Sequence, residues 1–149
     1  SVGNYNASTK NAAAYDLFAS KGTRRIVIRV KSYKGNPKRK GEGIQYAAKP
    51  HGSVFNNLDG NDKGDFVVIV RICPEEPEEF YVLPTIEVDH AINDSNEKWH
   101  QHPKRDGSPR KITNHRALDF DGEQTKRAPH RGYRKIWEKY LNNWKILDG

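Results

Sequence analysis

The sequence feature that most constrains the fold is the apolar run "DFVVIVRI" at residues 65–72. No polar residue interrupts its centre, which is typical of a strand that is buried on both faces. A polar turn with two prolines follows at 74–79, and "FYVLP" at 80–84 predicts the returning strand. The run therefore indicates the centre of a sheet that is covered on both sides.

A second strand is predicted in "RRIVIRVKSYKG" at residues 24–35, where apolar and polar residues alternate. The alternation puts aliphatic side chains on one face and cations on the other: Ile26, Ile28 and Val30 against Arg25, Arg29 and Lys31. Cations that follow one another along one strand face repel each other. The row therefore indicates an anionic partner, either within the chain or outside it.

Residues 11–20 favour a helix by their alanines and a strand by the alternation at Tyr15, Leu17 and Ala19. We interpret 14–20 as a strand that pairs with 24–33 through a short turn at Lys21 and Gly22. Asp16 would then face the row of cations. An ion pair between Asp16 and Arg29 or Lys31 is one interpretation of this arrangement, and a functional site is the other.

The remaining segments predict one domain over residues 1–149. A polar excursion covers 34–64 with a short strand around 44–48, and Thr85 is expected to cap a short helix through Ile92 with Glu87 in its first turn. Residues 93–130 are expected to form a long basic loop region. Apolar spacing of three and four residues over 133–147 predicts an amphipathic, aromatic-rich C-terminal helix.

The net charge of +7 is unevenly distributed. Basic residues gather in 21–40 and 98–135, whereas acidic residues gather in 59–65 and 75–79. Segregated charge of this kind indicates a surface that faces a polyanion, although a solvated basic surface has the same composition.

Cys73 is the only cysteine, so a disulfide framework is excluded and a cytoplasmic location is expected. No apolar run approaches the roughly 20 residues of a membrane span, and no secretory signal is visible.

The segments "YDLFA" and "RRIVIRVKS" together resemble the core of the PD-(D/E)XK nuclease-like superfamily, in which an Asp on one strand precedes an acidic residue, any residue and Lys on the next. "DFVVIVRI" followed by "FYVLPTIEV" is similar to a strand–strand–Pro–helix run in small bacterial members, and "YLNNWKIL" to a Trp-rich terminal helix. The resemblance implies a restriction-endonuclease-like α/β fold, with a mixed central β-sheet flanked by helices.

Carried over by position, the resemblance implies that Asp16 is a metal ligand and Lys31 the catalytic lysine, with Mg²⁺ as the cofactor. Arg29 occupies the acidic position of the motif, and a guanidinium cannot bind a cation. Either another carboxylate has taken over this role, or the metal site is lost. Asp65 is the candidate additional ligand, and Glu42, Asp62 and Glu87 are further carboxylates to consider.

Two functions are therefore expected for this domain. The first is a metal-dependent endonuclease that acts on nucleic acid, with DNA as the expected ligand. The second is a catalytically inactive nucleic-acid-binding or protein-interaction module. In either case, we expect the phosphate contacts to come from a set of basic residues on or just after the second strand: Arg25, Arg29, Lys34, Lys38, Arg39 and Lys40. The histidines at 90–115 match no zinc-binding spacing, and no nucleotide P-loop is present.

Overall fold

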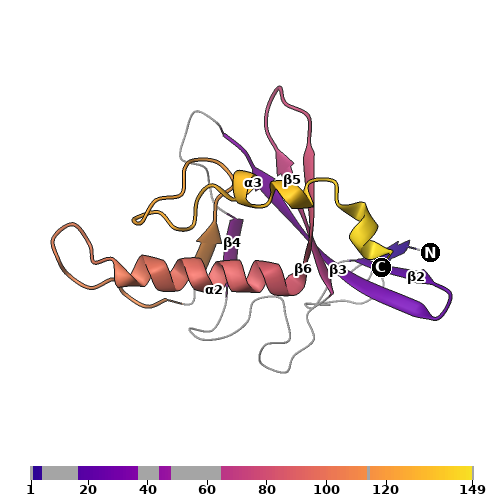
Figure 1. The fold of residues 1–149 in the computed structure, drawn as a ribbon, viewed down its shortest axis with the longest axis horizontal. Coiled ribbons are helices and arrows are strands. Elements are labelled where there is room, and N and C mark those ends of the chain that lie inside the picture. The colour runs from indigo at the N-terminus through magenta and orange to yellow at the C-terminus, as the bar shows by residue number, and fades with distance from the viewer. Residues whose placement is uncertain (1, 5–16, 37–43, 48–64, 114, 149) are drawn as a thin grey trace.

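The computed structural model describes residues 2–4, 17–36, 44–47, 65–113 and 115–148 (Figure 1). Its main sheet has five strands in the order β1-β2-β3-β5-β6. These strands are β1 (Val2–Asn4), β2 (Leu17–Lys21), β3 (Arg24–Lys34), β5 (Phe66–Ile72) and β6 (Glu79–Pro84). Strands β3 and β5 are parallel and the other neighbours are antiparallel, so the sheet is mixed. The expected general α/β class is confirmed.

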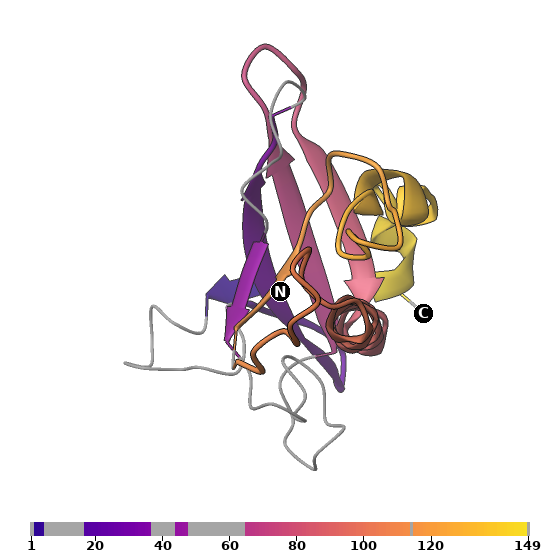
Figure 2. The same ribbon diagram turned by 90° about the vertical axis from the view of Figure 1, so that its left-hand side faces the viewer.

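A second, two-stranded sheet and the helices lie beside the main sheet (Figure 2). Strands β4 (Ile44–Ala47) and β7 (His115–Leu118) form a separate antiparallel pair. The helices are α2 (Thr85–Gln101), α3 (Tyr133–Ile136) and the 3₁₀ helices η1 (Glu138–Tyr140) and η2 (Trp144–Leu147). Within the described ranges, no helix has the length and apolar character that a membrane crossing requires.

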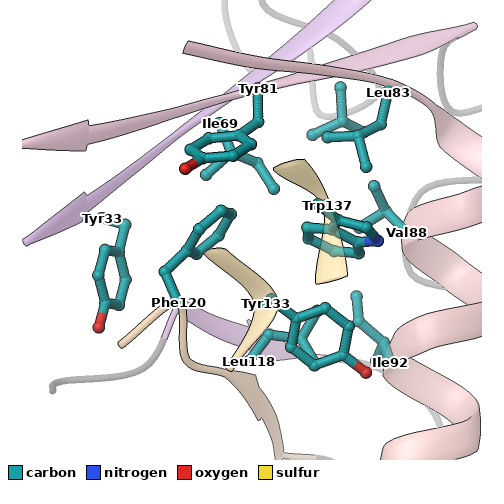
Figure 3. Close-up of a cluster of buried hydrophobic side chains, with 11 residues drawn as sticks. Tyr33, Ile69, Tyr81, Leu83, Val88, Ile92, Leu118, Phe120, Tyr133 and Trp137 are labelled. Carbon is teal, nitrogen blue, oxygen red and sulfur yellow. The ribbon is translucent and has the colours of Figure 1, made fainter. Parts of the chain in front are cut away.

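One face of the sheet packs against α2, α3 and the segment after β7 (Figure 3). This face contributes Tyr33, Val67, Ile69, Tyr81 and Leu83, which meet Val88 and Ile92 of α2 together with Leu118, Phe120, Tyr133 and Trp137. Phe120 is at the centre, because its ring centroid lies 4.7 Å from that of Tyr81, 5.3 Å from that of Tyr33 and 5.7 Å from that of Trp137. We call this set the aromatic core.

The other face of the sheet carries a second cluster, in which Ile26, Ile28, Val68 and Val82 are buried. Ile146 and Leu147 of η2 pack against this cluster. Val67 and Ile69 therefore point into one core while Val68 points into the other, and each of the three is at most 6% exposed. This confirms that the strand at 65–72 is buried on both faces.

The predicted strands are present at 17–21, 24–34, 66–72 and 79–84, including the β2–β3 hairpin, while 14–16 of the strand predicted at 14–20 lie outside the described residues. The helix predictions need three corrections. The helix after Pro84 runs to Gln101 rather than to Ile92, so the expected loop at 93–130 begins later and also contains β7. Thr85 is not the cap either. Pro84 occupies the N-cap position and has no polar side-chain atom with which to cap the helix, while Thr85 already lies inside the first turn.

The single amphipathic helix predicted over 133–147 is wrong. The α-helix stops at Ile136, and the following residues bind to the edge of β6 instead of continuing the helix. Leu141 forms a bridge with Tyr81, and the amide of Asn142, whose φ is 52°, donates to the carbonyl of Phe80 over 2.7 Å. The apolar residues of this segment consequently divide between the two cores instead of forming one stripe.

Candidate nucleic-acid interface

The cations of β3 lie on the same face of the sheet as α2. The register pairs Arg29 with Val67 and Lys31 with Ile69, both of which belong to the aromatic core. Because side chains alternate along a strand, Arg25, Arg29 and Lys31 share the face of Tyr33, opposite to Ile26 and Ile28. Arg25 is exposed, whereas Arg29 and Lys31 are half-buried. The predicted row of cations on one strand face is therefore present.

Arg25 is held over an aromatic ring next to the turn of the β2–β3 hairpin. Its guanidinium carbon lies 4.4 Å from the ring centroid of Phe18, a cation–π contact that is worth about 0.5–1 kcal/mol at an exposed site. The neighbouring Arg24 donates from Nη1 to the carbonyl of Asp148 over 2.8 Å and so ties the C-terminal segment to the hairpin. Arg25 is thereby positioned while its charge stays accessible to solvent.

The structure brings together only part of the predicted site. Asp16 lies outside the described residues, as do Lys38, Arg39 and Lys40. Leu17, which follows Asp16 in the sequence, pairs with Ile28 of β3. Lys34 is exposed but projects from the face opposite to Arg29 and Lys31. Among the predicted phosphate contacts that the structure describes, Arg25 and Arg29 therefore share a surface and Lys34 does not.

Asp65, the candidate additional metal ligand, joins β3 to the start of α2. Its Oδ2 accepts from the amide of Val27 over 2.9 Å, and its backbone amide donates to the Val27 carbonyl over 2.9 Å. The amide of Thr85 donates to the Asp65 carbonyl over 3.0 Å. Val27 precedes Lys31 by four residues, which is about 13 Å along a strand. The structure therefore does not bring the carboxylate of Asp65 to Lys31.

The described residues do not fit a Mg²⁺ ion at β3. Mg²⁺ takes oxygen ligands in octahedral geometry and is usually held by one or two carboxylates with several waters. Arg29 occupies the acidic position of the motif, and its positive charge opposes a cation. Within the described ranges, no three His, Cys, Asp or Glu side chains come together in a group that could hold a metal.

A buried ionic network at the far end of β3 was not anticipated from the sequence. Arg71 of β5 is fully buried, and its Nη2 and Nε donate to Asp121 Oδ1 over 3.0 and 3.2 Å. Its Nη1 donates to Glu76 Oε2 over 2.8 Å. Burial disfavours the charged guanidinium, but the hydrogen bonds with Glu76 and Asp121 outweigh it and raise the pKa of Arg71. The same bond from Arg71 lowers the pKa of Glu76.

Tyr33 extends this network to the segment after β7. Its hydroxyl donates to Asp119 and lies 3.2 Å from Asp121 Oδ2, which also accepts from the amide of Asn36 over 3.0 Å. Burial, reinforced by the hydrogen bond with Asp119, raises the pKa of Tyr33. A Cβ on Gly35 would come within 2.9 Å of the Arg71 guanidinium, so only glycine fits there. The network fixes where β3 ends, and it is structural rather than ligand-facing.

The sequence carried one signal for this network, a lone arginine in an otherwise apolar strand. A buried charge requires a partner, and Arg71 is the only charged residue in "FVVIVRI". Its partners were not identifiable, because Asp121 is 50 residues away in the chain. The acidic turn at 74–79 supplies Glu76, and Glu79 at the start of β6 binds Arg134 over 2.7 Å.

No family model matches the chain, and neither a curated protein nor a solved structure matches it. The resemblance to the nuclease-like superfamily therefore rests on the segments "YDLFA", "RRIVIRVKS", "DFVVIVRI" and "FYVLPTIEV".

Proposed function

We propose that this chain is a nucleic-acid-binding domain of the PD-(D/E)XK nuclease-like kind, and that DNA is its ligand. The observation that carries the proposal is the common face of three cations on β3. Arg25, Arg29 and Lys31 project from the side of the sheet that α2 covers, next to the buried Val67 and Ile69. The β2–β3 hairpin and the strand–strand–Pro–helix run from β5 to α2 agree with the motifs that the resemblance uses.

The chemistry of this face suits a phosphate backbone. Guanidinium groups donate two parallel hydrogen bonds to phosphate oxygens, and an ammonium group adds a point charge. Contacts of this type give affinity without sequence specificity, and each contact makes binding more sensitive to salt because counterions are released from the nucleic acid. The net charge of +7 adds a long-range attraction to any polyanion.

Hydrolysis is the more demanding form of the proposal. It requires Mg²⁺ bound by Asp16, as the resemblance implies, together with a further carboxylate from outside the described residues. A bound metal would supply hydroxide and neutralise charge at the scissile phosphate. Asp65 is bonded to Val27 and is therefore not available as the second metal ligand beside Lys31, and Arg29 repels a cation. Both features favour a module that binds nucleic acid without cleaving it.

A binding titration tests the proposal. Fluorescence anisotropy with a labelled DNA duplex at low salt should give saturable binding by the wild-type chain, weakened by Arg29→Ala and by Lys31→Ala. Lys34→Ala is the matched control, because Lys34 is a cation of the same strand on the opposite face. Each lost phosphate contact should reduce the slope of log K against log salt by about 0.9. Absence of duplex binding by the wild type would refute the proposal and leave a protein partner as the alternative.

A plasmid-nicking assay with Mg²⁺ or Mn²⁺ separates the two forms. Cleavage that both Asp16→Ala and Lys31→Ala abolish would establish an endonuclease. Binding without cleavage would establish the non-catalytic module. Cleavage that survives both substitutions would show that the residues taken from the resemblance are not the catalytic ones.

A further inference from the structure

A second concentration of positive charge lies beyond the C-terminal end of α2. Residues 102–113 and 122–131 contain seven lysines and arginines against two acidic residues, Asp106 and Glu123. These 22 residues therefore hold a net charge of +5, which is most of the +7 of the whole chain. The cations are Lys104, Arg105, Arg110, Lys111, Lys126, Arg127 and Arg131. We call the two segments together the distal basic surface.

The first of these segments is shaped by its own hydrogen bonds. The amide of Lys104 donates to the carbonyl of Ser108, and the amide of Gly107 donates to the carbonyl of Lys104, both over 2.9 Å. Asp106 accepts from the amide of Ser108 over 3.0 Å and from its hydroxyl over 2.6 Å, which lowers the pKa of Asp106. The one acidic side chain of this segment is thus engaged within the turn, while Lys104 and Arg105 are exposed.

Arg110 packs over the indole ring of Trp99, near the end of α2. Its guanidinium carbon lies 4.2 Å from the ring centroid of Trp99, and its Nε donates to the carbonyl of His102 over 2.8 Å. His100 stacks edge-on against the same indole, with ring centroids 5.1 Å apart. A cation–π contact of this kind is worth about 0.5–1 kcal/mol at an exposed site, and it holds the Arg110 guanidinium beside the other cations of the segment.

The second segment adds Lys126, Arg127 and Arg131, none of which forms an ion pair among the described residues. The side chain of Arg131 packs over Gly122, where a Cβ would lie 3.2 Å from Cδ, and its buried Nε makes no hydrogen bond within the described ranges. Burial lowers the pKa of the adjacent His130, and the charges of Arg131 and Arg110 lower it further, against the opposing charge of Asp119. The unpartnered Nε of Arg131 and the repulsion among these cations favour an external anion.

We infer that the distal basic surface is a second contact for the phosphate backbone of the same nucleic acid. This inference rests on the proposed function and extends it to the size of the ligand. Helix α2 has 17 residues and is about 25 Å long. It begins at Thr85, at the end of β6, and the distal basic surface lies beyond its other end (Figure 1). A duplex that spans this length contacts both the cations of β3 and the distal basic surface, while the exposed carboxylates of Glu87, Asp94 and Glu97 disfavour a path directly over α2. The ligand is then a duplex longer than about seven base pairs, at about 3.4 Å per pair.

A double substitution at the tip of the turn tests the inference. Lys104→Ala/Arg105→Ala should weaken binding to a duplex of about 20 base pairs tenfold or more at low salt and reduce the salt slope by about two. The matched control is Lys34→Ala/Lys139→Ala, which removes the same charge from exposed lysines outside both surfaces and should change affinity far less. Equal weakening by the two double variants would overturn the inference, because only net charge would then matter.

Duplex length supplies a readout that a general charge effect does not reproduce. The wild type should gain affinity steeply once the duplex exceeds about seven base pairs, and Lys104→Ala/Arg105→Ala should lose that step. Wild-type binding that only β3 substitutions weaken would overturn the second contact and leave the proposed function standing. Failure of the wild type to bind any duplex would overturn both. Binding of polyglutamate as tight as that of a duplex of equal charge would overturn nucleic acid as the occupant.

Discussion

Replacing Arg71 by methionine should cost this protein a large part of its stability. The guanidinium is fully buried and donates to Asp121 and Glu76 at 2.8–3.2 Å. Methionine fills a similar volume but leaves the carboxylate of Asp121 buried without its cation. Removing one partner of a buried ion pair costs about 3–5 kcal/mol. Because domains of this size have about 5–15 kcal/mol of stability in total, the loss is a substantial fraction of it.

Urea denaturation measures this loss directly, with fluorescence of the buried Trp137 as the probe. Arg134→Met is the matched control, since Arg134 binds Glu79 of the same network but its side chain is 45% exposed. An exposed ion pair contributes about 0–1 kcal/mol. In thermal unfolding of a domain of about 150 residues, the same loss should lower the melting temperature of Arg71→Met by roughly 6–20 °C, and that of the control by only a few degrees.

A double variant tests the physical cause of the loss. Asp121→Leu in the Arg71→Met background removes the uncompensated carboxylate and should recover part of the lost stability. Equal destabilisation by Arg71→Met and Arg134→Met would show that the buried ion pair contributes nothing beyond a surface contact.

Three further predictions concern the same network and the C-terminal segment. Tyr33→Phe should cost about 1–3 kcal/mol in urea denaturation, since it removes the hydroxyl that donates to the buried carboxylate of Asp119, whereas Tyr81→Phe should cost less. The pKa of Glu76 is lowered from 4.5 by Arg71, so unfolding free energy should fall as pH drops below 4.5, and Arg71→Met should flatten that slope; an unchanged slope would contradict the assignment. Asn142 has a φ of 52°, so Asn142→Ala should lower the melting temperature by an amount equivalent to about 1 kcal/mol while Asn142→Gly is nearly neutral; equal effects would contradict a backbone origin.

The sheet was predictable because its strands carry strong local signals. Alternation at 24–34 and the apolar run at 66–72 fix the strands and the faces of their residues, and Pro84 marks where β6 ends. The common face of Arg29 and Lys31 follows from the same alternation. These features depend only on neighbours in the sequence.

The helices were less predictable because their buried positions are not consistently apolar. After Ile92, the buried face of α2 continues with Ser95, whose hydroxyl donates to the carbonyl of Ile92 over 3.1 Å, so the apolar pattern stops while the helix does not. At the C-terminus the pattern is helical but misleading. Trp137 packs into the aromatic core while Leu147 packs against the other face of the sheet, which one straight helix cannot achieve.

The candidate site was predictable to the extent that it lies on one strand. Whether Asp65 could be a metal ligand depended on the residue of β3 beside which it lies. The parallel pairing of β3 and β5 places Asp65 beside Val27 and not beside Lys31. The contacts among Arg71, Asp121 and Tyr33 join residues 50 to 88 positions apart, for which the sequence offers no local signal.

An NMR titration of the ¹⁵N-labelled chain with a DNA duplex shows which backbone amides sense the ligand. If the cations of β3 bind the phosphate backbone, the largest shift changes fall on Arg25–Lys31 and diminish as salt is added. Shift changes confined to η2 and the opposite face of the sheet, with the amides of Arg29 and Lys31 unaffected, would contradict this mode of binding.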